Sequence, residues 1–464
     1  MDISKKFHYV GISGDGMSAI AQFHVRAGGH ISGSDRAFDN NEKKDILKKL
    51  TDLGIDIYKQ DGSGVDECDY LVTSTAIEST VPDFARAQRR GIEILHRSDM
   101  LAHFVAQRRT IAIGGTSGKS TVVAMVFEIL SAAGKSPSLI TGGKLVRLME
   151  QGMIGNAWNG ESDILVIEAD ESDGTIVKYE PEIGVVLNLS KDHKEQDVTA
   201  QMFGKFKART RGVFLAGDDQ NLDYLKEGAL RFGLGAQADV SASDIDLASE
   251  YSAFAVENTT FKIPLPGLHN VQNALAAIAV CRSAGVGLTK MVKPLADYGG
   301  VHRRFQSLGK KAGIEVIDDF AHNPVKIMAT IRAAQLRGSR VIAIFQPHGF
   351  YPTRFMWKEF IESFTNGLRS GDMIWLLEIY YAGGTTQKDI SSADLVREIN
   401  QNGGRANYAG SRETLLNFLA REAREGDVIV VMGARDATLS AFAEEILSNV
   451  GEKKAYPLSK QDSD

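Results

Sequence analysis

Short hydrophobic runs alternate with longer stretches of helical periodicity along almost the whole chain. Residues 7–12 form the first hydrophobic run, residues 17–27 follow a helical pattern, and residues 30–34 form the next run. This alternation is typical of β-α-β units, whose strands pair into parallel sheets with helices on both faces. The pattern predicts an α/β fold of mainly parallel sheets.

Two breaks divide this pattern into three segments. The segment QRR at residues 107–109, with two basic residues, precedes a new strand pattern at 110–113, and Gly299 and Gly300 precede another restart. We therefore expect three α/β domains over residues 1–106, 107–300 and 301–464, a number that suits 464 residues. Residues 238–265 alternate instead like an antiparallel ribbon. Further strands are expected at 70–74, 92–95, 163–167, 183–189, 315–317, 341–345, 373–377 and 428–432, and helices at 121–133 and 270–283.

Composition narrows the possible partners. The net charge of −6 argues against a general nucleic-acid binder or a protein held on anionic lipid. Cys68 and Cys281 are the only cysteines, too few for a disulfide framework or a cysteine-rich metal site. No apolar signal core or run of about 20 apolar residues is present. We expect a cytoplasmic protein with neither nucleic acid nor membrane as partner.

The strongest chemical signal is a glycine-rich loop between the strand pattern at 110–113 and the helix pattern at 121–133. Glycines let backbone N–H groups face phosphate oxygens, and the helix N-terminus adds its positive end. Lys119 would lie near the β- and γ-phosphates, and Ser120 would ligate Mg²⁺. The usual spacing needs glycine at position 113, where isoleucine stands, so the loop is a shorter relative. The alternative is a glycine turn that only caps a helix.

Two polar clusters follow later strands of the same segment. Residues 168–173 hold four carboxylates in six positions, which are hard oxygen ligands of the kind that Mg²⁺ prefers beside nucleotide phosphates. A solvated acidic turn is the alternative. After the strand at 183–189, His193 is a candidate for a second metal ligand or a substrate contact, and taken alone it is equally well a surface histidine.

The first strand leads into a second glycine-rich turn, GISGDG at residues 11–16. Asp35 ends the next strand about 20 residues later, as a ribose-binding acid would. The glycine spacing is not that of a dinucleotide fingerprint, so pyrophosphate binding is favoured over an NAD-dependent oxidoreductase. A simple tight turn is the alternative. The charge of Asp15 would oppose a pyrophosphate unless its side chain points away.

In chain order, seven segments together resemble the Mur ligases. They are GTSGKS at residues 115–120, EADESD at 168–173, DH at 192–193, GLHNVQNA at 267–274, HRRF at 302–305, DDFAHNP at 318–324 and FQPH at 345–348. Residues 11–21 and SGSD at 32–35 are most similar to the members that add the first amino acid or recycle a murein tripeptide. The set spans nearly the whole chain.

The resemblance implies a Rossmann-like UDP-sugar domain, a central phosphate-loop ATPase domain and a Rossmann-like C-terminal domain that brings the amino substrate. It further implies an ATP-dependent amide ligase with two Mg²⁺ ions in peptidoglycan precursor synthesis. The substrates would be UDP-N-acetylmuramate and L-alanine or another amine, joined through an acyl phosphate. The tripeptide-recycling reaction, a different acceptor, and an idle nucleotide-binding paralogue remain alternatives, and the chain would be a monomer or a homodimer.

Individual roles follow from the same resemblance. Lys119, Glu171, His193 and Arg304 would be catalytic, with Ser120 and Glu171 on one Mg²⁺ and His193 on the second. The nucleotide would be bound by Gly115, Thr116, Ser117, Gly118, Lys119, Ser120, Thr121, Asn270, Asn273, Arg304 and Asp319. The other substrates would be bound by Gly11, Ser13, Gly14, Gly16, Met17, Asp35, Ser74, His322, His348 and Arg354.

Three positions depart from the pattern of the alanine-adding members. Gly349 follows His348 where they carry a basic residue, so that Arg354 would have to hold the amino acid's carboxylate. Asn323 stands where they usually have a second histidine. Lys207 lies where sibling enzymes carry a carbamylated lysine, although a solvated lysine is the better interpretation.

Overall fold

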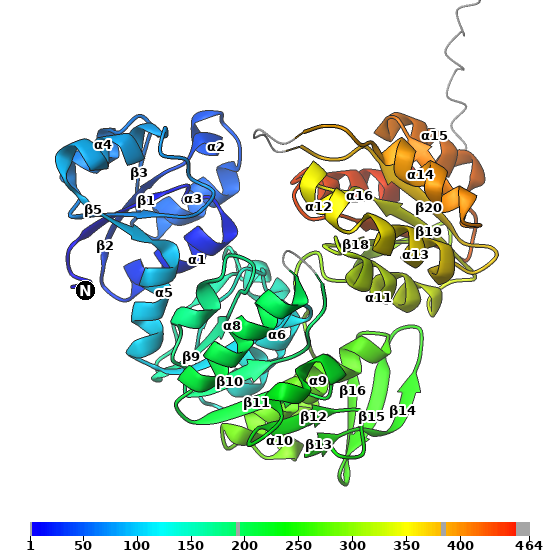
Figure 1. Cartoon of the computed structure of the whole chain (residues 1–464), viewed down its shortest axis with the longest axis horizontal. Helices are drawn as coiled ribbons and strands as arrows, with labels where there is room; N and C mark the ends of the chain where they lie inside the picture. The colour runs from blue at the N-terminus through cyan, green and yellow to red at the C-terminus, as the bar shows by residue number, and fades with distance from the viewer. Residues whose placement is uncertain (1, 192–194, 382–386, 452–464) are drawn as a thin grey trace, which may run out of the picture. The chain divides into compact units, whose positions relative to one another are not determined.

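The computed structural model describes residues 2–191, 195–381 and 387–451 (Figure 1). The chain divides into two compact units. The first comprises residues 1–245, 253–263 and 271–302, and the second comprises residues 246–252 and 264–270 together with the chain from Arg303 onward. The two units are described separately below.

The first unit begins with a five-stranded parallel sheet in the order β3-β2-β1-β4-β5. The chain order reverses between β1 and β4, and open α/β sheets bind ligands at the carboxyl ends of strands at such a point. Gly11 follows β1 directly and Asp35 follows β2, so both lie at that edge. The strands are β1 (Lys6–Val10), β2 (His30–Ser34), β3 (Asp56–Tyr58), β4 (Tyr70–Thr73) and β5 (Glu93–His96). The helices are α1 (Asp15–Arg26), α2 (Arg36–Asp39), α3 (Lys44–Asp52), η1 (Ser63–Glu67), α4 (Pro82–Arg90) and α5 (Arg97–Ala106).

The same unit continues with an eight-stranded sheet in the order β13-β12-β11-β10-β6-β9-β7-β8, in which β8 runs antiparallel to β7. Strand β6 lies between β9 and β10, so the loops that follow these three strands meet at one edge. The strands are β6 (Arg109–Gly114), β7 (Ser138–Ile140), β8 (Ala157–Trp158), β9 (Ile164–Glu168), β10 (Ile183–Val186), β11 (Val213–Gly217), β12 (Leu230–Gly233) and β13 (Val240–Ser241). The helices are α6 (Lys119–Ala132), α7 (Val146–Glu150), η2 (Thr175–Lys178), α8 (Gln196–Arg209) and η3 (Gln220–Leu225).

A separate three-stranded sheet follows in the segment that was expected to form a ribbon. Its strands are β14 (Ser243–Leu247), β15 (Ser252–Val256) and β16 (Thr259–Ile263), paired in sequence order. Helices α9 (Leu268–Ser283) and α10 (Leu288–Ala296) come next. Helix α9 is the helix expected at 270–283.

The second unit contains a six-stranded sheet in the order β17-β18-β22-β19-β20-β21. Its edge strand β17 is antiparallel to β18, and the other pairs are parallel. The strands are β17 (Gln306–Lys311), β18 (Ile314–Asp319), β19 (Arg340–Phe345), β20 (Met373–Leu377), β21 (Ala406–Ala409) and β22 (Asp427–Met432). The helices are α11 (Pro324–Gln335), α12 (Phe350–Phe355), α13 (Trp357–Gly367), α14 (Ser392–Gln401), α15 (Arg412–Glu422) and α16 (Leu439–Asn449).

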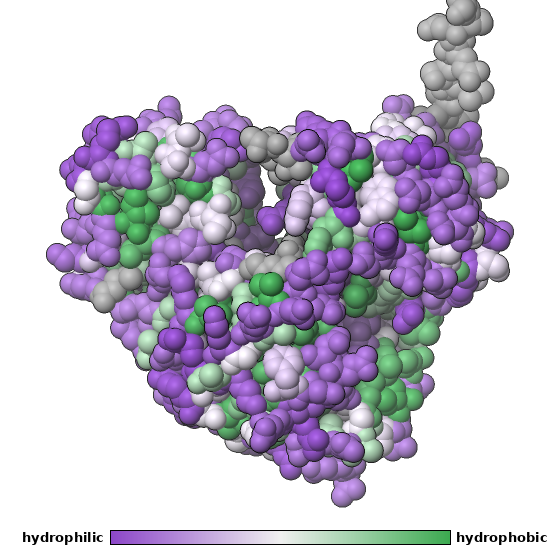
Figure 2. Space-filling view, viewed as in Figure 1, coloured by the Kyte–Doolittle hydropathy of each residue, from purple (hydrophilic) through white to green (hydrophobic). Residues whose placement is uncertain are grey.

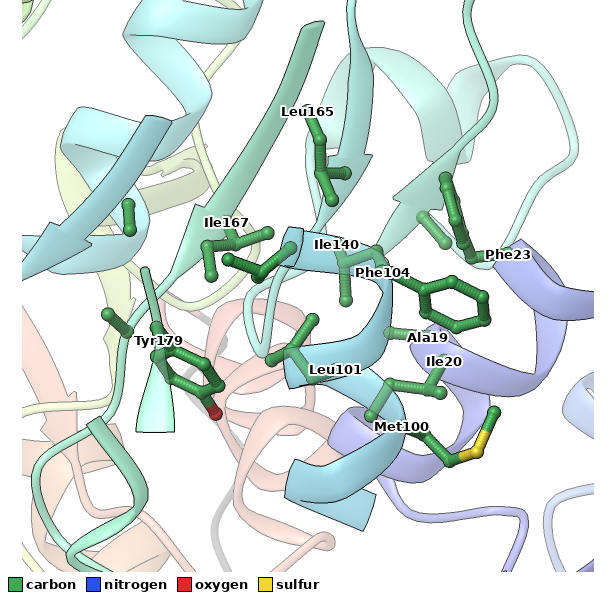
Figure 3. Close-up of a cluster of buried hydrophobic side chains, with 14 of the residues drawn as sticks. Ala19, Ile20, Phe23, Met100, Leu101, Phe104, Ile140, Leu165, Ile167 and Tyr179 are labelled. Carbon is green, nitrogen blue, oxygen red and sulfur yellow. The ribbon is translucent and has the colours of Figure 1, made fainter. Parts of the chain in front are cut away.

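One hydrophobic cluster joins the first two sheets of the first unit. Figure 3 shows Phe23 of α1 and Phe104 of α5 packed near Ile140 and Leu165 of the eight-stranded sheet. The rings of Phe23 and Phe104 meet edge to face at 4.9 Å. Burial of large apolar side chains is the main stabilising contribution in a core of this kind. The glycine turn after β1 and the phosphate loop after β6 therefore lie on one packed body.

The surface in Figure 2 is mostly hydrophilic, with hydrophobic residues in scattered areas. Scattered exposed hydrophobic residues such as Val198 and Tyr351 are ordinary for a folded protein. Within the described part of the chain, no helix has the length and apolar character needed to cross a bilayer.

The expected strands agree with the observed ones within a few residues, and the α/β class of mainly parallel sheets is confirmed. The strand expected at 183–189 ends earlier, at Val186.

Glu128, in the middle of α6, is a buried carboxyl that makes the stability of the first unit depend on pH. Burial raises the pKa of Glu128 to about 7 from its ordinary value of 4.5, although Arg147 at 3.7 Å and the backbone of Gly299 oppose this. A carboxyl with a raised folded-state pKa favours folding below its unfolded-state pKa, and this contribution is lost as pH rises to about 7.

We therefore expect Glu128→Gln to gain stability relative to the parent protein as pH rises. The gain between pH 5 and pH 8 should be about 2 to 3 kcal/mol, since one pKa unit corresponds to about 1.4 kcal/mol. Thermal unfolding of both proteins at the two pH values measures it. An equal difference at both values would contradict the burial argument.

Candidate active site

The loop after β6 has the backbone of a phosphate loop. Gly115 and Gly118 adopt positive φ angles of 131° and 85°, and α6 begins directly afterwards at Lys119. Asn188, which follows β10, holds the loop in place. Its side-chain Oδ1 accepts the backbone N–H of Ser117 at 2.8 Å and the hydroxyl of Thr116 at 3.0 Å. Asn188 thus fixes the shape of the loop, which leads directly into the N-terminus of α6.

Lys119 is buried among carboxylates. Its Nζ lies 2.6 Å from Glu171 and 3.6 Å from Asp170, and it donates to the carbonyl of Gly115 at 2.8 Å. Burial alone would lower the pKa of Lys119, but Glu171, Asp170 and Glu168 outweigh it and raise the pKa above the ordinary value. Lys119 is therefore held as a cation where a phosphate would arrive.

Ser120 pairs with a different carboxylate. Its hydroxyl lies 3.1 Å from both oxygens of Glu168, the last residue of β9. Glu168 also accepts the hydroxyl of Thr141 at 2.9 Å and the N–H of Gly142 at 3.2 Å. The sequence predicted Glu171 as the carboxylate that shares a metal with Ser120, whereas the structure places Glu171 on Lys119. The segment after β9 thus contacts the start of α6 at two places, Glu168 at Ser120 and Glu171 at Lys119.

A hydroxyl and a carboxylate are hard oxygen donors of the kind that Mg²⁺ prefers, so Ser120 and Glu168 suit that ion. Among the residues that the structure describes, no group of three or more His, Cys, Asp or Glu side chains is arranged to hold a metal by itself. His193, the predicted second metal ligand, lies outside the described residues.

Two of the predicted nucleotide contacts, Asn270 and Asn273, belong to α9. Asn273 lies against the phosphate loop, since a Cβ at Gly118 would fall 2.3 Å from its Oδ1. Asn270 is buried, and its side chain donates to the carbonyl of Pro266 at 2.8 Å. Thr121 is buried in the first turn of α6.

The glycine turn after β1 is held by Asp35. One carboxylate oxygen accepts the N–H of Ser13 at 2.8 Å, and the other accepts the N–H of Ala37 at 2.9 Å as the N-cap of α2. Gly11 has a φ of 73°, and Ile77, on the turn that starts at Ser74, lies where a side chain at position 11 would be. Asp35 therefore shapes the turn, in addition to the ribose contact predicted for it.

Met17 does not present its side chain to a ligand. It is 3% exposed and packs in the core cluster that joins the first two sheets. The substrate contact predicted for Met17 stays a prediction, and it would involve the backbone, because position 17 is on the inner face of α1. Gly14, which precedes α1, donates its N–H to the carbonyl of Gly11 at 3.1 Å.

The charge of Asp15 is neutralised within the first unit. Its carboxylate lies 3.1 Å from Nζ of Lys144. Lys144 follows Gly143, which packs against the side chain of Ser120. The segment after β7 thus contacts both glycine loops, and Asp15 brings no uncompensated charge to the turn.

In the second unit, Arg304 and Asp319 lie close together. The guanidinium of Arg304 stacks on Phe320 at 5.0 Å. Burial raises the pKa of Asp319, while Arg304 acts in the opposite direction. The carboxylate of Asp319 accepts the N–H groups of Phe305 and Ala321, each at 2.6 Å.

The two predicted histidines of the second unit also meet. The rings of His322 and His348 are 5.5 Å apart, edge to face. Asn323, which replaces a second histidine, caps α11 by accepting the N–H of Lys326 at 2.9 Å. Arg354 forms an ion pair with Asp389, which already provides a carboxylate for it.

Lys207 donates to the carbonyls of Leu225 at 2.9 Å and Glu227 at 2.5 Å. An unmodified ammonium provides these donors, so the solvated or structural interpretation is favoured over carbamylation.

Three models of protein-family domains match successive segments of the chain. Residues 6–109 match the model "Mur ligase family, catalytic domain", residues 113–281 the "Mur ligase middle domain" and residues 303–435 the "Mur ligase, glutamate ligase domain". The chain is 34% identical over 449 residues to the UDP-N-acetylmuramate--L-alanine ligase of Desulfatibacillum aliphaticivorans, covering 92% of this chain and 95% of that relative.

The chain belongs to the Mur ligase family.

Other members of the family are also similar to the chain over most of its length. The UDP-N-acetylmuramate--L-alanine ligase of Geobacter sulfurreducens is 35% identical over 93% of this Mur ligase and 95% of its own length. The crystal structure of UDP-N-acetylmuramate-alanine ligase from Thermotoga maritima superposes with a TM-score of 0.77 at 25% identity, over 96% of this chain and 98% of that one. The family resemblance and the three-domain α/β fold expected from the sequence are confirmed.

Sequence reasoning on this Mur ligase singled out the acidic segment that contains Asp173, but it gave no role to three other polar residues near the loops, namely Asn188, Lys144 and Arg97. Asn188 follows β10 beside the phosphate loop, and position at a strand end could have identified it. Lys144 carried no motif, because its partner Asp15 is 129 residues away in the chain.

The Asp15 and Lys144 pair gives a testable prediction. Lys144→Met leaves the carboxylate of Asp15 beside the glycine turn without its cation, so an anionic ligand there should bind about tenfold more weakly. The double variant Asp15→Asn/Lys144→Met should recover most of this loss. Titration of UDP into each variant measures the change in affinity. An equal loss of UDP affinity in the single and the double variant would show that the charge of Asp15 plays no part.

Proposed function

We propose that this Mur ligase joins L-alanine to the lactyl carboxylate of UDP-N-acetylmuramate, with conversion of ATP to ADP and phosphate. The observation that carries the proposal is the arrangement after β6. There the adjacent residues Lys119 and Ser120 contact two different carboxylates, Glu171 and Glu168 respectively. The curated relatives that act in this way are similar to the chain over more than nine-tenths of its length.

The proposed reaction has two steps. A carboxylate oxygen of the sugar nucleotide attacks the γ-phosphorus of ATP, the bond to the β,γ-bridging oxygen breaks, and ADP leaves. The neutral amine of L-alanine then attacks the acyl carbon, loses a proton, and expels phosphate to leave an amide. The first step brings negative charges together, and the second builds negative charge on the acyl oxygen and the departing phosphate, so cations and N–H donors at the phosphates lower both barriers.

The residues of the phosphate loop have separate tasks in this scheme. Thr116 and Ser117 donate their N–H groups to Asn188, so the backbone N–H groups of Gly115 and Gly118 and the start of α6 would bind the phosphates. Lys119 exchanges its contact with Glu171 for the transferring phosphoryl group, so the cation is already in place and desolvated. Asn188 keeps the loop in register with β10.

Mg²⁺ would be held by Ser120 and Glu168. The assignment made from the sequence differs, since it places Glu171 with Ser120 on one ion and His193 on a second. When bound, Mg²⁺ neutralises charge on the phosphate oxygens. The roles of Arg304 and Asp319 at the nucleotide, and a second ion, remain part of the proposal.

Two features of the second unit bear on the choice of amine. Gly349 stands where alanine-adding members carry a basic residue, and Arg354 pairs with Asp389. This favours a tripeptide or another amine as the second candidate. We also propose that the enzyme acts in the cytoplasm, since Cys68 and Cys281 are both free thiols.

Release of ADP by the purified chain distinguishes the acceptors. With Mg-ATP and UDP-N-acetylmuramate present, L-alanine, L-serine, glycine and murein tripeptide are added one at a time. We expect L-alanine to raise ADP release at least about tenfold above the others, since discrimination of small side chains reaches about 1–3 kcal/mol. If only the tripeptide stimulates ADP release, the tripeptide and not L-alanine is the acceptor. If no amine stimulates it, the proposed ligase activity is contradicted.

A further inference from the structure

The guanidinium of Arg97 lies against the first turn of α1, beside the glycine turn that follows β1. A Cβ at Gly16 would fall only 2.8 Å from Nη1 of Arg97. The end of the Arg97 side chain therefore lies directly beside position 16. Gly16 has no positive φ angle that would require glycine. A side chain at position 16 would therefore have to displace the end of the Arg97 side chain.

Arg97 is held in this place by the other sheet of the same unit. Its Nη2 donates to Oδ2 of Asp173 at 2.7 Å. Asp173 belongs to the acidic segment after β9, and its side chain is 8% exposed. Its other oxygen, Oδ1, accepts the N–H of Thr175 at 3.0 Å and the hydroxyl of Thr175 at 2.6 Å. Asp173 is thus a fixed carboxylate that orients one edge of the guanidinium.

The remaining donors of Arg97 are directed to no other group among the described residues, where Asp173 is its hydrogen-bond partner. An arginine fork with one edge fixed can use its other N–H groups on an anion, and guanidinium binds phosphate oxygens in this way. The side chain of Arg97 is 25% exposed, so it is accessible to a ligand.

The surroundings also keep the guanidinium at the turn. Helices α1 and α5 pack together through Phe23 and Phe104. A second ion pair, Lys178 with Asp99 at 2.6 Å, joins the start of α5 to the same region of the eight-stranded sheet. This second pair forms no contact with Gly16 and provides a matched control.

We propose that Arg97 binds the diphosphate of the sugar nucleotide at the glycine turn, and that Asp173 is the positioning residue that orients Arg97 for this contact. The inference rests on the proposed function, because the ligand is the uridine diphosphate part of that substrate. It gives the acidic segment a second role. Glu171 holds the cation of the phosphate loop, and two residues later Asp173 holds a cation for the sugar nucleotide.

The test compares UDP with uridine, which differ in the diphosphate alone. Both are titrated into the full chain by calorimetry, with saturating Mg-ADP present so that the phosphate loop is filled. In the parent protein UDP should bind more tightly than uridine. Arg97→Met should reduce this preference about ten- to a hundredfold by weakening UDP, with uridine affinity unchanged, as expected for loss of one charged hydrogen-bonded contact.

The other variants separate positioning from folding. Asp173→Asn and Gly16→Ala should each reduce the UDP preference about three- to tenfold, because both leave the charge of Arg97 present but displaced. Lys178→Met should leave the preference as in the parent protein. In turnover, Arg97→Met should raise KM for UDP-N-acetylmuramate far more than KM for ATP.

The outcomes are distinct. Failure of the parent protein to bind UDP would contradict the proposed substrate itself. An intact UDP preference in Arg97→Met, or equal losses of UDP and uridine affinity, would overturn the role of Arg97 while leaving the proposed reaction in place. An unchanged preference in Asp173→Asn, with loss in Arg97→Met, would overturn the positioning role of Asp173.

Discussion

Replacing Lys119 by methionine is expected to lower the rate of ADP formation about a thousandfold. In the proposed reaction the ammonium group of Lys119 contacts the transferring phosphoryl group, and loss of one such electrostatic contact costs about 10²- to 10³-fold in turnover. Rates of ADP release at saturating substrates measure the effect. Lys293→Met, which removes an exposed lysine paired with Asp297 on α10, serves as the control and should keep the parent rate.

The same substitution should also destabilise the ligand-free protein. It leaves the carboxylates of Glu171 and Asp170 together without their shared cation, and removing one partner of a buried ion pair costs about 3–5 kcal/mol. We expect the melting temperature to fall by about 5 °C or more. The double variant Lys119→Met/Glu171→Gln should regain much of the stability and none of the activity. Normal turnover in either variant would contradict the assignment of Lys119.

Replacing Glu168 by glutamine should raise the Mg²⁺ concentration needed for half-maximal activity about ten- to a hundredfold. The structure pairs Glu168 with Ser120, and loss of a charged ligand or its support costs about that much metal affinity. Glu171→Gln should shift the Mg²⁺ midpoint less than about threefold, because Glu171 holds Lys119 instead. Activity measured across Mg²⁺ concentrations at fixed ATP compares the two.

The opposite ranking of these two variants would support the assignment made from the sequence, in which Glu171 shares the metal with Ser120. Thr141→Val provides a further check, since it removes one hydroxyl from Glu168 without removing charge. It should shift the Mg²⁺ midpoint in the same direction as Glu168→Gln, by about twofold to fivefold. A larger effect from Thr141→Val than from Glu168→Gln would argue against a metal role for Glu168.

The sequence predicted the fold and the order of strand, glycine-rich loop and helix around Lys119, because both are encoded locally. Strand β6, its glycine loop and α6 are consecutive, and Lys119 and Ser120 are fixed by their place in that motif. The hydrophobic runs of β9 and β10 likewise placed their polar ends at the same edge of a parallel sheet.

The parts that the sequence did not predict depend on contacts between distant segments. EADESD contains four carboxylates, and the sequence alone could not assign them to Ser120, Lys119 and Arg97. Met17 follows a glycine turn as a ligand-binding residue would, yet the packing of α1 turns its side chain into the core. The cation beside Asp15 could not be predicted, because Lys144 lies 129 residues further along the chain.

Transfer of an oxygen label tests the central claim most directly. UDP-N-acetylmuramate labelled with ¹⁸O in its lactyl carboxylate is incubated with the enzyme, Mg-ATP and L-alanine, and the products are examined by mass spectrometry. The proposed acyl phosphate predicts ADP, an alanyl amide, and phosphate that carries one oxygen from the carboxylate. AMP as the nucleotide product, or unlabelled phosphate without amide, would contradict it.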